Sequence, residues 1–380
     1  MPSDRLFGPS LSTDKMSAAV SDDAWLMAML RFESALAAVQ ARLGLIPEEA
    51  GAAIGAASKR GPFDVTSIGR QAAESASPVV PLVAALQHAV GKKHAPFVHH
   101  AATSQDTLDT AMMLVARDGL DLLLDGLDTL AATCSSLART HRATPMAART
   151  LMQVALPTTF GYKAALWLEG VMDARRRLAA LRQNGLAVQL GGPVGTFDRH
   201  DVVVELAAEL GLTAPELPWH SVRSRVVELG SAMAMAAGAA SKISLDVILL
   251  AQSEVAEVAP GKPGGSSSMK HKRNPAQAVE TRAAFALAAA NAGVLLAAMP
   301  GEHERSAGAW QSEWPALTEL FRVTAGAVDR TAELLADLHI DTARMKANLG
   351  PVTGGHGVDA AAALADRAVE MYTEEMSHDR

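Results

Sequence analysis

The sequence contains one cysteine, few aromatic residues and no surplus of positive charge. The single cysteine, Cys134, excludes a disulfide within the chain and fits a reducing compartment. Leu130 and Leu137 flank it at helical spacing, which indicates a buried structural thiol rather than a nucleophile. The formal net charge of −7 argues against a nucleic-acid partner, because no basic face is evident outside one loop.

Alternating polar and apolar runs of useful length are also absent, so a chain of 380 residues with 49% hydrophobic content is expected to be almost entirely helical. The first ten residues contain no apolar signal core, and no uninterrupted apolar run reaches the length needed to cross a bilayer. No cysteine, histidine and carboxylate side chains cluster at the spacing of metal ligands. We expect a cytoplasmic protein without membrane contact, metal or cofactor.

Helical periodicity predicts an all-α fold in three parts. Residues 1–102 form a small N-terminal helical domain, residues 103–345 a bundle of long helices that carries a loop at 260–275, and residues 346–380 a short C-terminal helical segment entered through Gly354 and Gly355. The expected helices cover residues 22–43, 79–90, 103–141, 159–183, 226–258 and 276–299, with one more beginning near Pro47.

Two of these helices, 226–258 and 276–299, are apolar almost all the way round. A helix without a polar face has to be covered on every side, which a small monomer does not provide. The pattern therefore favours the centre of a multi-helix bundle built by several subunits. The alternative is that both helices lie inside one large monomeric core.

Residues 264–275, GGSSSMKHKRNP, read as a mobile anion-binding loop. Two glycines and three serines give little reason for one fixed shape, and three cations, a histidine and an amide follow. Asn274 is a favoured N-cap and Pro275 a favoured first helical residue, so the loop should end on a helix N-terminus, which itself attracts anions. The alternative is a solvated turn or a basic address signal.

Hydroxyl or amide side chains stand at three predicted helix starts, formed by Thr103 and Ser104, by Thr158 and Thr159, and by Asn274. Each could do no more than cap its helix. Each also offers free backbone N–H groups to an anion. If the fold gathers these helix starts, the pocket would suit a substrate with several carboxylates. The cations that would complete it are Arg223, Arg225, Lys272 and Arg305.

The loop closely resembles the GSSxMPxKxNP signature of the fumarase/aspartase superfamily, with Lys270 where that family usually has proline. The segment HHAATSQDTLDT resembles the first block of the superfamily, with His99, Thr103, Ser104 and Asp106 in register, and ARTLMQVALPTTFGYK resembles the second. The resemblance implies a fumarase/aspartase-like homotetramer around a central helical core. It also implies active sites that each draw one block from each of three subunits.

Two departures from that family pattern bear on the reaction. Leu151 stands where fumarases and argininosuccinate or adenylosuccinate lyases have a histidine, and Val279 where they have a glutamate. The histidine-dependent step of those lyases is therefore not expected here. The segments PWHSVRSR and EHERSAGAWQSEWPAL instead resemble the 3-carboxy-cis,cis-muconate cycloisomerases of bacterial aromatic degradation.

That second resemblance implies closure of 3-carboxy-cis,cis-muconate, or a similar 3-substituted muconate, to its γ-lactone in the β-ketoadipate pathway. Lys272 and Asn274 would stabilise the developing dianion and Ser266 would transfer the proton. The remaining side chains assigned to carboxylate binding are His99, Thr103, Ser104, Thr158, Arg223 and Arg305. Two alternatives stay open: a lyase that eliminates fumarate from an adenylosuccinate-like substrate, and a non-catalytic scaffold of the same fold.

Overall fold

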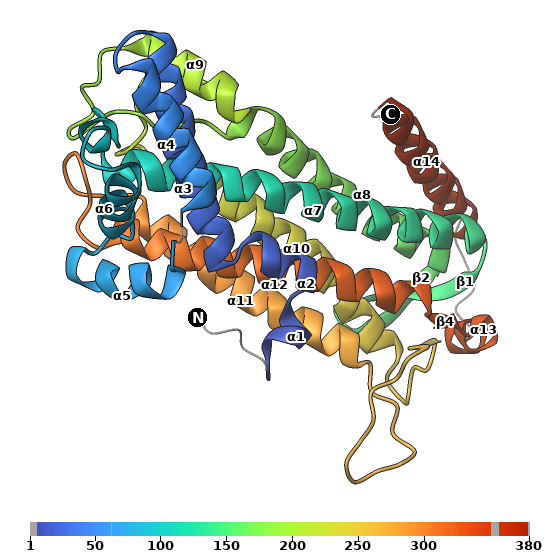
Figure 1. Cartoon of the computed structure of the whole chain (residues 1–380). Helices are drawn as coiled ribbons and strands as arrows, with labels where there is room; N and C mark the ends of the chain where they lie inside the picture. Colours follow the sequence, from blue (N-terminus) through green and yellow to red (C-terminus); the bar gives the residue numbers. More distant parts are fainter. Residues whose placement is uncertain (1–5, 62, 351–356, 379–380) are drawn as a thin grey trace.

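The computed structural model describes residues 6–61, 63–350 and 357–378, and Gly354 and Gly355 lie outside them. Long helices run side by side through an elongated body, with a group of shorter helices at one end (Figure 1). That group contains a helix that begins after Ser21, whose side chain accepts from the Ala24 N–H. The elements before residue 104 are α1 Gly8–Leu11, α2 Asp14–Ala19, α3 Asp22–Arg42, α4 Glu48–Arg60, α5 Val65–Ser75, α6 Val79–Val90 and the short 3-10 turn Ala95–Phe97.

The predicted long helices form the bundle. Along α7 the buried residues Leu120, Leu123 and Leu127 recur every three or four positions, which gives the helix one face in the core. Close packing depends on small residues: a Cβ at Gly119 would lie 2.7 Å from Phe321 Cε1. The bundle helices are α7 Ser104–Thr140, α8 Phe160–Ala180, α10 Ser224–Leu250, α11 Ala276–Ala298 and α12 Ala309–Ala336. A π-helical turn at Leu181–Gly185, α9 His200–Leu210, α13 Thr342–Leu349 and α14 Gly357–His378 complete the described helices.

One helix ends earlier than predicted. Helix α10 stops at Leu250 rather than 258, and Val258–Ala259 forms a short strand, β3, that pairs with β4, His339–Ile340. The segment between the end of α10 and β3 is fixed by Glu257. Its fully buried carboxylate binds Arg149 at 2.6 Å and accepts from the Asn348 amide at 2.9 Å. A tertiary ion pair, which sequence periodicity does not encode, therefore sets this boundary.

The expectation of an almost purely helical chain overlooked a hairpin. Strands β1 Pro145–Thr150 and β2 Gln153–Thr159 pair antiparallel around a two-residue turn at Leu151 and Met152. Both turn residues have positive φ, 50° and 66°, a conformation that two-residue hairpin turns require and that usually selects asparagine or glycine. Because neither residue is typical of that turn, the sequence carried no hairpin signal.

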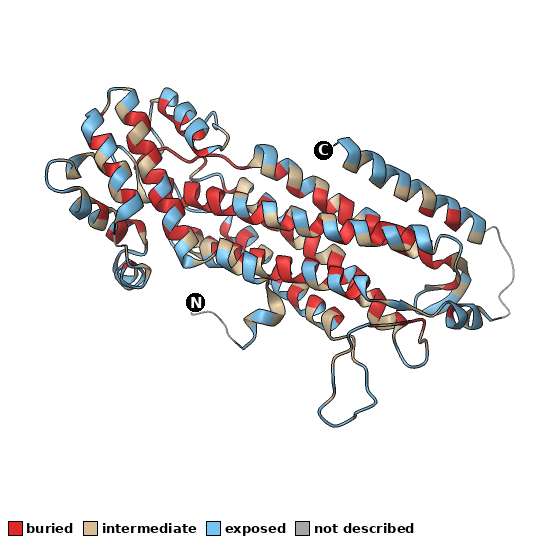
Figure 2. Cartoon of the chain, turned by 45° about the vertical axis from the view of Figure 1, so that its right-hand side comes forward, coloured by how far each residue is buried: buried red, intermediate tan, exposed pale blue. Residues whose placement is uncertain are grey.

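Helix α11 has large apolar side chains that the chain does not cover. Val279, Leu287, Val294 and Leu296 are all exposed, and Figure 2 shows how mixed the burial of the long helices is. By length and composition α10 and α11 would both qualify as membrane spans, contrary to the sequence expectation, but helices in the core of soluble proteins qualify equally. An uncovered apolar face on a bundle helix is instead typical of a subunit interface.

Candidate active site

The N-terminal end of α7 carries the first group of predicted site residues. Thr103 precedes the helix, and its backbone N–H donates to the Asp106 carboxylate at 3.0 Å. The same buried carboxylate accepts three further N–H bonds, from the Gln189 side chain and from the backbones of Gly191 and Gly192. Burial raises the pKa of Asp106 to about 6, against the opposing effect of these four donors. Asp106 therefore fixes the loop at 189–192 against the start of α7.

His99 lies just before this helix and pairs with a carboxylate. Its Nδ1 is 2.7 Å from Glu33 Oε1, and Glu33 is 1% exposed. Burial lowers the pKa of His99, but the charges of Glu33 and Asp106 outweigh it, so the net shift is upward. Glu33, on α3, was not recognised from the sequence, because a single glutamate within an amphipathic helix gives no signal of its own.

Arg305 reaches the same end of the bundle from residues 299–308. Its Nε–H donates to Gln105 Oε1 at 3.0 Å, and its Nη2 donates to the Pro193 carbonyl at 3.2 Å. The Gln105 amide in turn donates to the carbonyl of His220 at 2.8 Å. Burial and the charge of Arg305 lower the pKa of His220, which favours a neutral ring. His220 lay within the PWHSVRSR segment but was not among the predicted site residues.

Arg223 does not have the environment predicted for it. It is buried, and its guanidinium donates to both oxygens of Asp109, at 2.6 and 3.0 Å, and to both oxygens of Glu313. Trp310 Nε1 also donates to Asp109 at 3.0 Å. Two buried carboxylates within the chain therefore occupy this cation, and the assignment to substrate binding does not agree with these contacts. Arg223 links α7, α10 and α12 behind the site.

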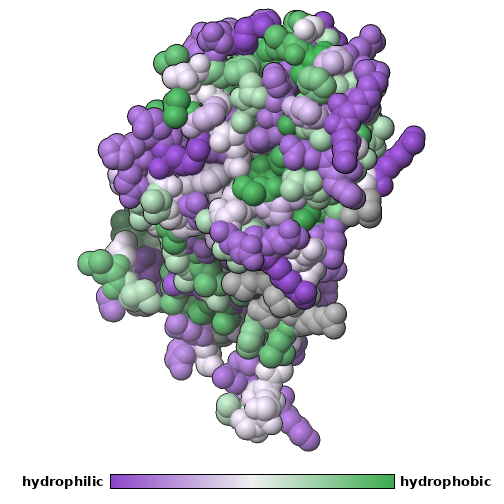
Figure 3. All heavy atoms as spheres, turned by 60° about the vertical axis from the view of Figure 1, so that its left-hand side comes forward, coloured by the Kyte–Doolittle hydropathy of each residue, from purple (hydrophilic) through white to green (hydrophobic). Residues whose placement is uncertain are grey.

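The predicted catalytic residues lie on the loop, which projects from the bundle with a mainly polar surface (Figures 1 and 3). Gly264 and Asn274 form an antiparallel bridge at its base, with N···O distances of 2.8 and 3.1 Å. Ser266 Oγ accepts from the Met269 N–H at 3.1 Å, and Lys272 is exposed. Asn274 is not the N-cap: its side chain donates to the Gly265 carbonyl at 2.9 Å, and Pro275 occupies the cap position before Ala276.

The β1–β2 hairpin holds the third group of predicted site residues, after those at the start of α7 and those on the loop. Thr158 pairs with Met146 in the sheet, while the Thr159 hydroxyl caps α8 by accepting from the Tyr162 N–H at 3.1 Å. Leu151 at the turn is 96% exposed, an unusual position for so large an apolar side chain. The tip of the hairpin is therefore an exposed apolar surface.

These three groups do not meet within one chain. The start of α7 lies at the end of the bundle near the N-terminal helices, whereas the hairpin lies at the opposite end and the loop projects from that half of the body (Figure 1). In the turned view of Figure 2 the loop again lies apart from the end of the bundle that carries the short helices. His99, Thr103, Ser104 and Arg305 are brought together, while Thr158 and the loop residues Ser266, Lys272 and Asn274 are placed elsewhere.

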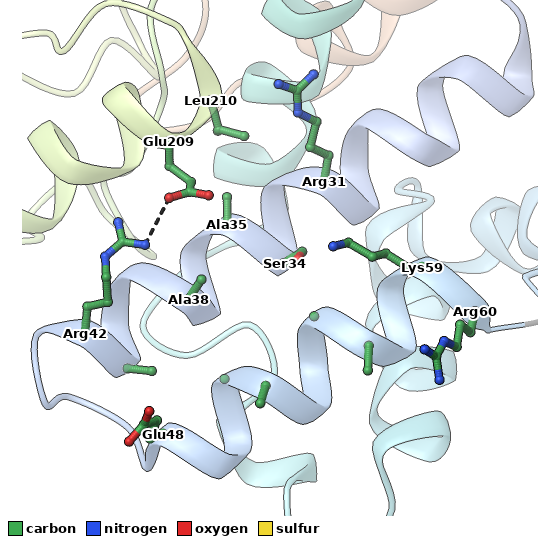
Figure 4. A pocket seen from close by; sticks show the side chains of 15 residues that line it. Arg31, Ser34, Ala35, Ala38, Arg42, Glu48, Lys59, Arg60, Glu209 and Leu210 are labelled. Atoms are coloured by element: carbon green, nitrogen blue, oxygen red, sulfur yellow. Dashed lines mark hydrogen bonds and ion pairs between the residues drawn. The ribbon is translucent and has the colours of Figure 1, made fainter.

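A cavity in the described part of the chain is lined by none of them. It measures about 910 Å³ and is formed chiefly between α3 and α4, with the end of α9 at its margin (Figure 4). An ion pair between Arg42 and Glu209 crosses its edge, and alanine and glycine residues form much of its lining. None of the predicted site residues lines this cavity.

Comparisons with known proteins place these features in context. A family profile described as lyase matches residues 10–287. The chain is 46% identical to nitrosuccinate lyase from Streptomyces davaonensis over 92% of its length and 77% of that protein. It is 42% identical to 3-carboxy-cis,cis-muconate cycloisomerase from Bradyrhizobium diazoefficiens, over 98% of this chain and 84% of the relative. The crystal structure of the Pseudomonas putida lactonizing enzyme superposes with a TM-score of 0.87 at 36% identity, covering 98% of this chain and 89% of that one.

Proposed function

The chain belongs to the lyase family of the fumarase/aspartase superfamily, and on that premise we propose that it is a 3-carboxy-cis,cis-muconate cycloisomerase. The family fold implies a small carboxylate substrate and an oligomeric assembly. The observation that carries the choice of reaction is Leu151, an exposed apolar side chain where the histidine-dependent lyases have their imidazole. Without that imidazole, a reaction whose nucleophile belongs to the substrate is favoured.

The reaction forms one C–O bond and one C–H bond and loses no atoms. A substrate carboxylate adds to an alkene carbon conjugated with a second carboxylate, and a proton joins the carbon alpha to that second group. The protein has to fold the substrate, stabilise an enediolate-like dianion and supply the proton. Lys272 provides charge for the dianion and Asn274 an amide donor, and Ser266 delivers the proton once the loop excludes water.

Carboxylate binding falls to the group at the start of α7. His99 and Arg305 bring cationic or polarised N–H donors. Thr103 and Ser104 bring hydroxyls, and Ser104 also brings a helix-terminal N–H group. Thr158 contributes from the hairpin. Arg223 serves this set indirectly, by neutralising Asp109 and Glu313 behind it.

The assembly that we propose is a cytoplasmic homotetramer in which three subunits contribute to each active site. Two features support it: the separation of the three groups along one chain, and the uncovered apolar side chains of α11. If neighbouring bundles pack with opposite directions, the loop of one chain reaches the α7 end of another.

A second candidate function follows from the relative that shares 46% identity. Elimination from nitrosuccinate would remove a proton from the carbon next to the C–N bond, break that C–N bond, and release nitrite and fumarate. That reaction also passes through a carbanion stabilised by an adjacent carboxylate, so Lys272 and Asn274 would have the same role in it. The scaffold reading is disfavoured by the intact Ser266, Lys272 and Asn274.

One set of assays separates these functions. Purified protein is incubated separately with 3-carboxy-cis,cis-muconate, nitrosuccinate and adenylosuccinate. Loss of the diene absorbance with formation of a lactone supports the cycloisomerase. Release of nitrite with fumarate supports the nitrosuccinate reaction, a change in the purine absorbance supports an adenylosuccinate lyase, and no turnover of any substrate overturns the proposal.

A further inference from the structure

The pairing of His99 with Glu33 goes beyond what the proposed reaction requires of His99 alone. We propose that Glu33 is a positioning residue that holds His99 as an imidazolium, so that Nε2–H is available to a carboxylate of the substrate. The inference rests on the proposed function in one respect only, the anionic nature of the substrate. The chain would then have a histidine–carboxylate pair in the first family block, whereas in the second block Leu151 stands in place of the histidine.

The geometry fixes one ring nitrogen. Glu33 Oε1 lies 2.7 Å from His99 Nδ1, a distance typical of a charge-assisted hydrogen bond. The Thr107 hydroxyl donates to the same oxygen at 2.9 Å and so holds the carboxylate toward the ring. With Nδ1 committed to Glu33, Nε2 is the remaining donor, and no partner for it occurs within the part of the chain that the structure describes.

The second carboxylate oxygen indicates a role beyond packing. Glu33 Oε2 is buried without a hydrogen-bond partner in the described residues. A buried carboxylate oxygen without a partner costs free energy that an apolar side chain in this place would avoid. Retaining the acid is therefore justified by its charge, and the ring of His99 is the group that the charge contacts.

The backbone around His99 is also in an unusual conformation. His99 and Ala101 have φ values of 59° and 57°, in the left-handed region that residues with a Cβ rarely adopt. Between them, the carbonyl of His100 accepts from the Gln40 side-chain amide at 2.9 Å, which ties this turn to α3. The same helix thus supplies both the bond that fixes the turn and the carboxylate that fixes the ring.

The charged groups that face His99 act in one direction. Glu33 on α3 and Asp106 on α7 both raise the pKa of His99, and burial opposes them. Because the net shift is upward, the ring stays charged to a higher pH than an exposed histidine would. The charge is fully present below the ordinary pKa and is lost as the pH rises through the shifted one.

The test is Glu33→Gln, an isosteric change that removes the charge and keeps an acceptor beside Nδ1. The ring of His99 is followed by NMR from pH 5 to 9, with its resonance assigned from its absence in His99→Asn. We expect the pKa of His99 to fall by about one unit or more in Glu33→Gln, a tenfold change in its protonation ratio. Thr107→Val, which leaves the carboxylate in place, is the matched control and should move the pKa less.

Substrate affinity supplies the second readout. For Glu33→Gln we expect KM to rise about tenfold at pH 8 and by a smaller factor at pH 5, where more of the ring is protonated without the carboxylate, with kcat nearly unchanged. Calorimetric binding of tricarballylate, a tricarboxylate that cannot cyclise, should show the same pH dependence. An equal loss at both pH values, or an unshifted His99 resonance, overturns the proposal. Failure to turn over any muconate while the NMR shift is observed refutes the proposed function and leaves the role of Glu33 intact.

Discussion

Arg223→Met offers the sharpest test of how the structure assigns this residue. The side chain of Arg223 is 4% exposed, and those of its partners Asp109 and Glu313 are 0% and 1% exposed. Methionine fills a similar volume but leaves two carboxylates buried without a cation. Breaking a buried ion pair by removing one partner costs about 3–5 kcal/mol of folding free energy. Substrate binding by a free arginine would instead leave stability nearly unchanged.

The pH dependence of the loss follows from the same cluster. Burial already raises the pKa of Glu313 although Arg223 opposes it, and without the guanidinium the upward shift grows. An acid whose pKa is raised in the folded state binds more protons folded than unfolded, so lowering the pH favours the folded state. The deficit of Arg223→Met should therefore be largest near pH 8 and shrink toward pH 5, as Glu313 takes up a proton.

The assay is urea unfolding followed by circular dichroism at fixed protein concentration, at pH 8 and pH 5. A triple variant, Arg223→Met with Asp109→Asn and Glu313→Gln, is the matched control, because it removes the charges together and should recover most of the lost stability. The reasoning is refuted if Arg223→Met unfolds at the wild-type urea concentration while its KM rises strongly. That result would return Arg223 to the substrate-binding set.

Four further outcomes are expected. Ser266→Ala should abolish turnover with the oligomer intact by size-exclusion chromatography, and a near-normal rate would remove the loop serine from the mechanism. Lys272→Met should lower kcat at least about a hundredfold, since a preorganised charge on a developing oxyanion contributes about 3–4 kcal/mol; a tenfold loss would make the lysine peripheral. Gly161→Ala should destabilise by about 2–3 kcal/mol in chemical denaturation, because its Cβ would lie 2.5 Å from Arg142 Cα. Leu296→Glu, on the exposed side of α11, should shift sedimentation toward smaller species, and an unchanged assembly would exclude that face from the interface.

Local sequence predicted the helices well where local forces decide them. The bounds of α6 and α11 agree with the predicted ranges to within one residue, because apolar periodicity and end signals lie within the segment itself. The end of α10 was wrong by eight residues, because the buried pair of Arg149 and Glu257 joins segments more than a hundred positions apart. The N-cap role of Asn274 was wrong for a similar reason, since its pairing with Gly264 across the loop replaced the cap.

The candidate site divides in the same way. The motifs identified the residue types that a polycarboxylate would need, and the structure brought His99, Thr103, Ser104 and Arg305 to one end of the bundle. Glu33 could not be found from the sequence, because its partner lies 66 residues away and an isolated acid on a helix has no motif. The pairing of Arg223 could not be foreseen, because a motif reports the presence of a cation and not whether buried carboxylates already surround it.

By itself, then, the sequence determined the helical class, the family and the chemical nature of the loop, since these depend on periodicity and on residues adjacent in the chain. The tertiary structure decided which charges are free. A side chain can bind a substrate only through donors that its own fold leaves unpaired, and pairing depends on contacts between distant segments. By that criterion Arg223, paired with Asp109 and Glu313, has no free donor of the kind expected, and Glu33 is the residue for which we propose a role.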